Sequence, residues 1–489
     1  MGSGTRRNPQ CHRRLHLVRA GATIDRMALT DEQVARLTDE RFAHTRPDLR
    51  GAPRVRRDQV PPGLRWPVLA QTAGLLRFRH RFVPYMHRRF GDVFTVWLIP
   101  GGRPLVIFTR PEHAREIFAG DPEFFHAGKG NAILGPIMGE HSLLLQDGAE
   151  HKRARKLLMP AFNGAALRGY EALVTGLARD EVARWTPGRT FRSLDRMNAL
   201  TLEVILRVVF GVTDERRLAE LRPRVNRTVN ISPAILLGWG WPRLQRFGPW
   251  KAQVDNQREL DRLMYAEIEE RRSASDLASR TDVLSRLIRT QDAGDVLTDA
   301  ELRDQLVTLL LAGHETTATA LAWALLEVGR DPAQLARARE AALSGDDVWL
   351  EAVMKESMRL HPVIPMVVRT LLKPATIGGI DLPAGVTVGP SILITHQRED
   401  NHPDPDVFRP ERFLEEHGNR VGPAANTWIP FGGGVRRCIG AGFSLMEGVA
   451  VLREVLRAYD VTAVGDDEPM VRNITSVPRN GARIRVAGR

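Results

Sequence analysis

The residue of this sequence best suited to chemistry is Cys438, which lies in a glycine-rich turn. The turn reads Phe-Gly-Gly-Gly-Val-Arg-Arg-Cys-Ile-Gly over 431–440, and apolar residues with helical spacing follow it at once. The dipole and free N–H groups of a helix N-terminus stabilise a thiolate. A thiolate is a good ligand for haem iron and favours O–O cleavage. An isolated cysteine beside such a turn is more often a small buried residue.

A second unusual stretch is Ala-Gly-His-Glu-Thr-Thr over 312–317, in the middle of a predicted long helix. Thr298 and Glu301 have the spacing of a capping box, and Pro332 ends the helix after roughly thirty residues, or about 45 Å. Glycine and paired threonines both disfavour a regular helix. A local interaction should compensate for them, and the simplest is a threonine hydroxyl that bonds the carbonyl four residues earlier.

Two further pairs of polar residues have helical spacing. His151 and Arg155 are four residues apart, so both can donate to one carboxylate, although a solvated basic helix has the same pattern. Glu356 and Arg359 are three residues apart and can form an ion pair. An exposed pair of that kind is common and contributes little to stability, so the pattern alone is weak.

The composition favours a globular chain that positions these residues in one core. The chain has 489 residues, of which 43% are hydrophobic and 26% are charged, which excludes disordered and fibrous classes. Its net charge of +12 permits a nucleic-acid-binding protein, but the basic residues are interleaved with acids and no nucleic-acid-binding motif occurs. We therefore expect no nucleic-acid partner.

Cysteine usage and hydropathy bear on the compartment. With only Cys11 and Cys438, a disulfide scaffold is excluded and a reducing cytoplasm is favoured. The longest apolar stretch, Leu306 to Val328, contains His314 and Glu315 and would be a costly membrane span. The sequence therefore predicts no transmembrane anchor.

Hydrophobic periodicity predicts a mainly α fold with a small β portion. The β segments are expected at Val93 to Leu98, at Leu105 to Thr109 and between Val367 and Val388. Residues 1–50 are read as a basic, flexible extension, within which Met27 is an alternative start, and residues 51–489 as a single domain. No flexible linker or internal repeat divides that domain.

The turn at 431–440 resembles the haem-binding loop of the cytochrome P-450 family, with every fixed position present. Further signatures follow in the family's order, so the resemblance extends from Pro61 to the C-terminus. The fold that it implies has a long central helix over the haem and the cysteine loop on the proximal side. Cys438 would be the axial ligand of the iron of haem b.

The resemblance also assigns roles to other residues. It implies that Glu315 and Thr316, at a local opening of the central helix, deliver protons during activation of dioxygen. The remaining assignments fall into three groups. The haem would contact His151, Arg155, Arg369, Phe431, Arg436 and Gly440. The substrate pocket would include Thr308, Ala312, Val363, Val367 and Thr475, together with the loop from Gly130 to Gly139. Glu356, Arg359 and Arg412 would form a structural cluster.

The activity implied is that of a bacterial, cytoplasmic monooxygenase that hydroxylates or epoxidises a hydrophobic molecule such as a fatty acid, terpenoid, steroid or polyketide. Electrons would come from a ferredoxin-type donor with a separate NAD(P)H-dependent reductase. An acidic donor would dock on Arg437, Lys152 and Arg153. The apolar segment from Ile235 to Trp241 suggests at most peripheral membrane contact. A non-catalytic haem-binding or sensor protein is the alternative.

Overall fold

The structure is a computed structural model that describes residues 29–44, 54–99, 101–229, 242–290, 294–416, 419–420 and 423–488. The α-helices are α1 (Asp31–His44), α2 (Val68–Phe90), α3 (Pro111–Ala119), α4 (Gly135–Met138), α5 (Gly148–Leu158), α6 (Gly164–Val182), α7 (Ser193–Val204), α8 (Glu215–Val229), α10 (Gly248–Ser273), α11 (Val283–Arg289), α12 (Asp299–Arg330), α13 (Pro332–Ser344), α14 (Asp347–Leu360), α15 (Ile392–Gln397) and α16 (Ala441–Ala458). Helices dominate, which confirms the predicted mainly α fold.

The strands are short. They are β1 (Val93–Leu98), β2 (Arg103–Phe108), β3 (Phe125–His126), β4 (Thr190–Arg192), β5 (Arg369–Leu371), β6 (Ala375–Ile377), β7 (Ile380–Leu382), β8 (Thr387–Pro390), β9 (Glu415–Glu416), β10 (Asn419–Arg420), β11 (Tyr459–Ala463), β12 (Pro469–Arg472), β13 (Thr475–Pro478) and β14 (Arg483–Gly488). One sheet has the order β1-β2-β8-β5-β3, and a second has the order β11-β14-β4. The pairs β12–β13, β6–β7 and β9–β10 are separate hairpins.

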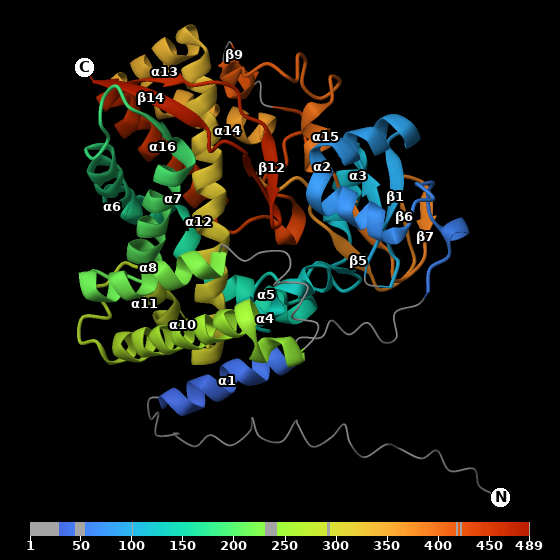
Figure 1. Cartoon of the computed structure of the whole chain (residues 1–489), viewed down its shortest axis with the longest axis horizontal. Coiled ribbons are helices and arrows are strands. Elements are labelled where there is room, and N and C mark those ends of the chain that lie inside the picture. Colours follow the sequence, from blue (N-terminus) through green and yellow to red (C-terminus); the bar gives the residue numbers. More distant parts are fainter. Residues whose placement is uncertain are drawn as a thin grey trace, which may run out of the picture.

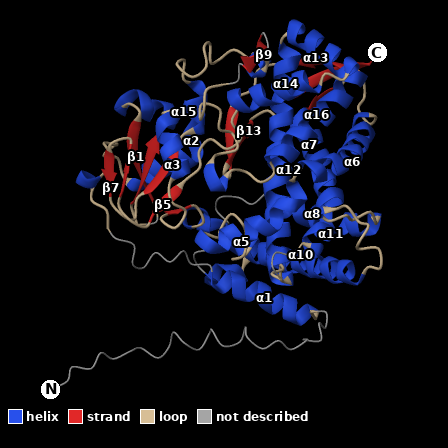
Figure 2. Cartoon of the chain, turned by 180° about the vertical axis from the view of Figure 1, so that it is seen from behind, coloured by secondary structure: helices blue, strands red, loops and turns tan. Residues whose placement is uncertain are grey.

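The five-stranded sheet begins where the sequence predicted it. β1 reads Val-Phe-Thr-Val-Trp-Leu, a run of β-branched and aromatic residues that suits a pleated sheet. Gly101 and Gly102 then adopt positive φ angles of 80° and 66° in the turn to β2, where a side chain would be strained. In Figures 1 and 2 this sheet, with α2 and α3, forms one side of the protein and the long helices form the other.

Helix α12 runs through the centre of the helical side (Figure 1). The predicted capping box is present, since Glu301 N donates to Thr298 Oγ1 at 3.3 Å and Thr298 N donates to Glu301 Oε2 at 2.8 Å. Among the described helices α12 alone is long and apolar enough to cross a membrane, but 78% of that window is buried within the protein. It is therefore the core helix against which α7, α14 and α16 pack.

Residues 31–44 differ from the flexible extension predicted over 1–50. They form α1, which lies along α10 (Figure 1). The reason is a stripe of residues four apart, since Val34, Thr38 and Phe42 are all buried at 0–2% exposure. The rest of the predicted extension, with Cys11 and Met27, lies outside the described residues except for 29–30. The apolar segment from Ile235 to Trp241 also lies outside them.

Candidate functional site

The glycine-rich turn presents Cys438 just before α16. Cys438 N donates to Phe431 O at 2.9 Å, and Gly440 stands at the N-cap position of α16. The turn is pressed against the end of α3, because a Cβ atom on Gly434 would lie 2.0 Å from Phe118 O. Gly434 also has a φ angle of 63°, which glycine adopts without strain. Both facts explain why this position is glycine.

The Cys438 side chain is exposed, yet burial by surrounding protein is the main influence on its pKa and raises it. Exposure of a side chain that protein surrounds indicates an internal space beside the sulfur. The Gly440 amide, Arg155 and Arg437 lower the pKa without reversing that rise. The expected net stabilisation of the thiolate by the helix N-terminus is therefore not found for the protein alone. A metal ion bound by the sulfur would supply this stabilisation, since coordination to a metal deprotonates a thiol.

Cationic side chains gather around the same space. Arg436 Nη2 lies 2.5 Å from Asp147 Oδ1, whereas Arg155 and Arg369 have no ion pair within the described part of the chain. Burial is the largest cause of the low pKa of His151, about 3, and of Arg369, about 10, and repulsion from Arg436 adds to both. Arg155 is close enough to Cys438 for the two to influence each other's pKa. Three arginines, of which Arg369 is buried and Arg155 and Arg436 are partly buried, thus lie near one carboxylate and a neutral His151.

This arrangement fits a haem. A flat macrocycle bound to the Cys438 sulfur would bring two propionates, and guanidinium groups that are wholly or partly removed from water need such anions. His151, Arg155, Arg369 and Arg436, which the sequence predicted separately, are brought together here from α5, β5 and the turn before α16. Phe431 and Gly440 frame the turn through their backbone, as Phe431 O accepts from Cys438 N and Gly440 O accepts from Ser444 N.

The predicted opening of α12 is not seen. Residues 299–330 are helical throughout, and Thr316 Oγ1 donates to Ala312 O at 2.6 Å. The simpler interpretation of the threonine, a bond to the carbonyl four residues earlier, therefore describes this structure. Ala312 is nevertheless exposed although it lies in a core helix, so α12 borders open space at this point.

Glu315 points to a different element from Thr316. Glu315 Oε1 lies 3.1 Å from Arg472 Nε at the end of β12, and Thr475 at the start of β13 also interacts with the carboxyl group. Burial raises the pKa of Glu315, and both partners oppose that rise. The acid is held by the β12–β13 hairpin, which the sequence did not indicate.

The cluster predicted to be structural is built around the Glu356 carboxylate. Arg359 donates to Glu356 at 2.7 and 2.9 Å, and both side chains have 0% exposure. Arg412 Nε donates to Glu356 Oε1 at 3.2 Å. Arg359 also donates to the carbonyls of His396 and Val407. The pair is thus a buried joint between α14 and the segment that leads to the cysteine turn, not surface decoration.

The predicted pocket residues do not all meet. Val363 O accepts from Ser476 N at 2.8 Å, next to Thr475, so these two segments lie side by side. Thr308 is buried, and its hydroxyl forms hydrogen bonds of 2.7 Å with Ser142 Oγ and with Asp304 O. Val367 packs instead against a separate apolar cluster that contains Phe118. Ala312 is the residue of this group with open space beside it.

Two residues near the site escaped the sequence interpretation. Glu447 of α16 is completely buried, and burial raises its pKa to about 8. Neither of its carboxyl oxygens has a hydrogen-bond partner among the described residues, although Thr317 is near enough to lower the pKa. No pattern distinguished it from a solvated helix acid. The other residue is Arg472, the partner of Glu315.

Arg153 does not present the unpaired charge that its predicted role in docking an electron donor requires. Its guanidinium lies 2.6 Å from Asp295 and 2.5 Å from Glu301, so its charge is already paired. Lys152 and Arg437 are exposed. They remain the exposed cations of the predicted docking surface.

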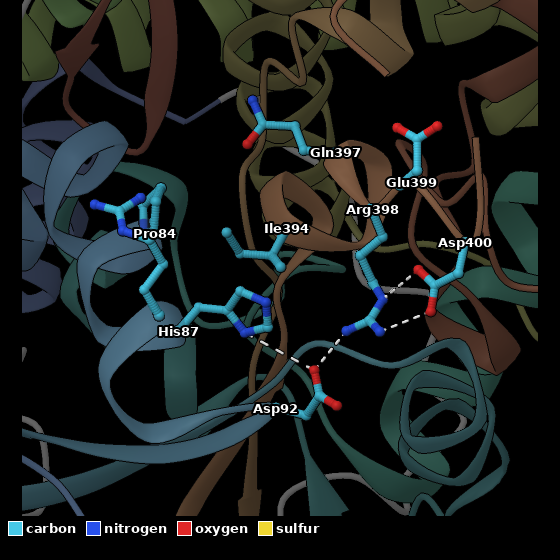
Figure 3. A pocket seen from close by; sticks show the side chains of 9 residues that line it. Pro84, His87, Asp92, Ile394, Gln397, Arg398, Glu399 and Asp400 are labelled. Carbon is cyan, nitrogen blue, oxygen red and sulfur yellow. Dashed lines mark hydrogen bonds and ion pairs between the residues drawn. The ribbon is translucent and has the colours of Figure 1, made fainter. Parts of the chain in front are cut away.

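A separate surface pocket of about 410 Å³ lies between α2 and α15 (Figure 3). Arg398 lies 2.5 Å from Asp92 and 2.7 Å from Asp400, and Asp92 is also 3.8 Å from His87. The pocket is thus lined by charges that pair with each other, and none of the residues around Cys438 belongs to it.

Comparison with known proteins identifies the family. The cytochrome P-450 family model matches residues 60–484. Cytochrome P-450 135A1 of Mycobacterium tuberculosis is 54% identical over 431 residues, which cover 87% of this chain and 95% of that protein. Cytochrome P-450 135B1 of the same organism is 41% identical over 436 residues, with 87% and 91% covered.

A solved structure shares the fold. Retinoic acid bound cyanobacterial CYP120A1 superimposes with a TM-score of 0.74 at 24% identity, covering 88% of this chain and 99% of that one. This likeness supports the fold alone. Together with the family match and the surroundings of Cys438, it leads to one conclusion: this chain belongs to the cytochrome P-450 family and is a haem-thiolate monooxygenase.

Proposed function

We propose that this protein inserts one oxygen atom from O2 into a hydrophobic organic molecule, with haem b held by Cys438. The observation that carries the proposal is the accessible Cys438 sulfur beside three arginines, Arg155, Arg369 and Arg436, of which Arg436 alone has a carboxylate partner in the described part of the chain. Haem b has the two propionates that such a cluster requires. When bound through a thiolate, haem supplies the reductive cleavage of the O–O bond.

Four side chains would hold the two propionates. Arg436 already donates to Leu143 O at 3.0 Å and lies 2.5 Å from Asp147, so it is fixed in place before a cofactor arrives. His151, Arg155 and Arg369 complete the group. Cys438 would be the iron ligand, with Phe431 and Gly440 shaping the turn around its sulfur.

Thr316 and Glu315 would hold and move the protons. The Thr316 hydroxyl beside Ala312 lies at the open side of α12 and can donate or accept once it leaves the Ala312 carbonyl. Burial raises the pKa of Glu315, which brings its proton exchange nearer to neutral pH, where a catalytic acid works best. Arg472, whose side chain is 30% exposed, extends from this acid toward solvent.

The proposed substrate class is hydrophobic because Ala312, the predicted pocket residue with open space beside it, is apolar. Ala312 and Val363 have no polar side-chain atoms, and Thr308 has its hydroxyl occupied by Ser142 and Asp304. Such a surface favours substrates such as fatty acids, terpenoids, steroids or polyketides, and the reaction is hydroxylation or epoxidation.

The electron donor would be a ferredoxin-type protein served by a separate NAD(P)H-dependent reductase, in a bacterial cytoplasm. Lys152 and Arg437 are exposed near the turn that carries Cys438, and they complement an acidic donor. No feature of the described residues favours the alternative of a non-catalytic haem sensor.

Turnover with an added ferredoxin, reductase and NADPH tests this proposal. Apolar molecules that shift the haem spectrum on binding should then yield products that contain one atom from ¹⁸O2. Arg437→Glu should slow the first electron transfer while haem content is unchanged, whereas Arg479→Glu, on the remote β13 side, should not. Binding of apolar molecules without any labelled product would reject the monooxygenase activity.

A further inference from the structure

The short helix α4 ends in three successive carbonyl groups that accept from two arginines. Arg41 Nε of α1 donates to Pro136 O at 3.0 Å. Arg303 of α12 donates to Ile137 O at 3.1 Å and to Met138 O at 3.2 Å. The last carbonyls of a helix have no partner within it, so these guanidinium groups satisfy the end of α4. A helix of four residues is not stable alone, and its position therefore depends on them.

Asp261 of α10 joins the two arginines. Its Oδ2 atom accepts from Thr38 Oγ1 and from Arg41 Nη2, each at 2.6 Å, and its Oδ1 atom accepts from Arg303 Nε at 2.8 Å. The Arg303 and Asp261 side chains are 0% and 1% exposed. Three helices, α1, α10 and α12, thus meet at one buried carboxylate, and the two arginines connect it to α4.

The loop after α4 is bonded on its other side to α12. Asp304 Oδ2 accepts from His141 N at 3.0 Å and lies 2.9 Å from His141 Nδ1. Gln305 Oε1 accepts from Leu143 N at 3.1 Å, and Thr308 donates to Ser142.

The same loop reaches the cysteine turn. Leu143 O accepts from Arg436, and Asp147 pairs with it. One continuous segment, 135–147, therefore connects the contact with α1 to the residues around Cys438.

We propose that α1 is a clasp, in which Arg41 positions the 135–147 loop and thereby sets access to the space above Cys438. The observation that singles out α1 is that residues 31–44 lie outside the 60–484 region matched by the family model. Arg41 is a positioning residue, because the hydrogen bonds seen for it within the described residues go to Pro136 O and Asp261 and not to the residues around Cys438. The clasp rests on the proposed function in that the space above Cys438 receives the substrate.

Removing Arg41 should loosen the loop without unfolding the protein. Asp261 retains Arg303 and Thr38 as partners, so no buried charge is left alone. Arg41→Met removes both the charge and the Nε donor. Arg41→Lys keeps the charge near Asp261 but loses the donor to Pro136 O, and it should have an intermediate effect. Asp39→Asn is the matched control, because it removes another α1–α10 ion pair, to Arg258 at 2.7 Å, that does not reach α4.

Hydrogen exchange of the haem-loaded full chain measures the effect directly. Amides of 135–147 should exchange about tenfold faster in Arg41→Met than in wild type or Asp39→Asn, while amides of α16 stay unchanged. A stopped-flow measurement with imidazole as the haem ligand should give faster binding in the same variant. In turnover, KM should change more than kcat.

Two outcomes overturn the clasp. Exchange over 135–147 that is equal in Arg41→Met and wild type would show that α1 does not position the loop. Faster exchange with unchanged imidazole binding would show that the loop does not set access. In both measurements the carbon monoxide spectrum first checks that haem is bound through the thiolate. A protein without that spectrum would count against the proposed function and not against the clasp.

Discussion

Arg472 Nε lies 3.1 Å from Glu315 Oε1, so an arginine of the β12–β13 hairpin holds the acid that precedes Thr316 in α12. The neighbouring Thr316 hydroxyl donates to its own helix at Ala312 O. Two adjacent residues of one helix are therefore controlled by different parts of the protein. Their contributions to proton transfer can be tested separately.

Arg472→Gln should move the pH dependence of turnover to higher pH. Arg472 lowers the pKa of Glu315 against the effect of burial, so its loss raises that pKa further and Glu315 stays protonated to higher pH. The measurement is kcat against pH with saturating electron donor, and Arg479→Gln is the control. A profile that coincides with that of wild type would show that Glu315 does not titrate in the limiting step.

Thr316→Val should reduce the product formed per NADPH by about a hundredfold, the order expected for loss of a proton donor. Oxygen should still be consumed, and the consumed oxygen should be released as hydrogen peroxide. Thr317→Val is the matched control, because the Thr317 hydroxyl bonds Ser444 Oγ at 3.1 Å and lies on a buried face. If Thr316→Val and Thr317→Val form the same amount of product per NADPH, Thr316 has no special role.

Glu356→Ala should destabilise the protein by about 3–5 kcal/mol, because it leaves Arg359 buried without its carboxylate. Arg359 and Glu356 both have 0% exposure, and Arg412 shares the same oxygen. Urea unfolding of the haem-loaded protein measures the free energy. Glu351→Ala removes a partly exposed pair with Lys355 on the same helix and should cost less than about 1 kcal/mol. A similar loss of unfolding free energy in both variants would mean that Glu356 does not connect α14 to the segment before the cysteine turn.

The hydrogen bond between His141 and Asp304 should hold the 135–147 loop less strongly as pH rises. Its hydrogen bond to Asp304 raises the pKa of His141, and Glu140 and Glu301 add to the rise, while burial opposes it. A raised pKa means that the stabilisation is complete below the ordinary pKa of histidine and is lost as pH rises through the raised value. Burial raises the pKa of Asp304, but the hydrogen bond from His141 and the charge of Arg303 outweigh it and lower the pKa, so Asp304 stays charged over that range.

Amide exchange over 135–147 against pH, corrected for intrinsic rates, should therefore show protection falling through the raised pKa of His141. In His141→Gln the corrected protection should be constant over the same range. A wild-type protection that does not change with pH would contradict a charged His141–Asp304 pair.

Patterns local in sequence gave much of the architecture. The capping box at Thr298 and the strand Val93–Leu98 depend on near neighbours, and the structure has both. The family resemblance supplied the fold around Cys438. By contrast, α1 was missed because Val34, Thr38 and Phe42 bury only a narrow stripe, beside a basic N-terminal stretch that suggested an extension.

The contacts that complete the site depend on distant parts of the chain. Nothing local to Arg472 shows that it reaches Glu315, and nothing local to Arg153 shows that Asp295 and Glu301 neutralise it. Two interpretations of Thr316 were open from the sequence, a local opening of the helix and a regular helix in which the hydroxyl bonds the carbonyl four residues earlier. The bond to Ala312 O agrees with the second. Burial of Glu447 likewise follows from the packing of α16 and not from its sequence.

The most direct test of the central claim is the carbon monoxide difference spectrum of the reduced, haem-loaded protein, compared between wild type and Cys438→Ala. If Cys438 is the iron ligand, wild type should show the strongly red-shifted Soret band of thiolate ligation and Cys438→Ala should lose it. A band typical of histidine ligation in wild type, or a red-shifted band that persists in Cys438→Ala, would contradict the account.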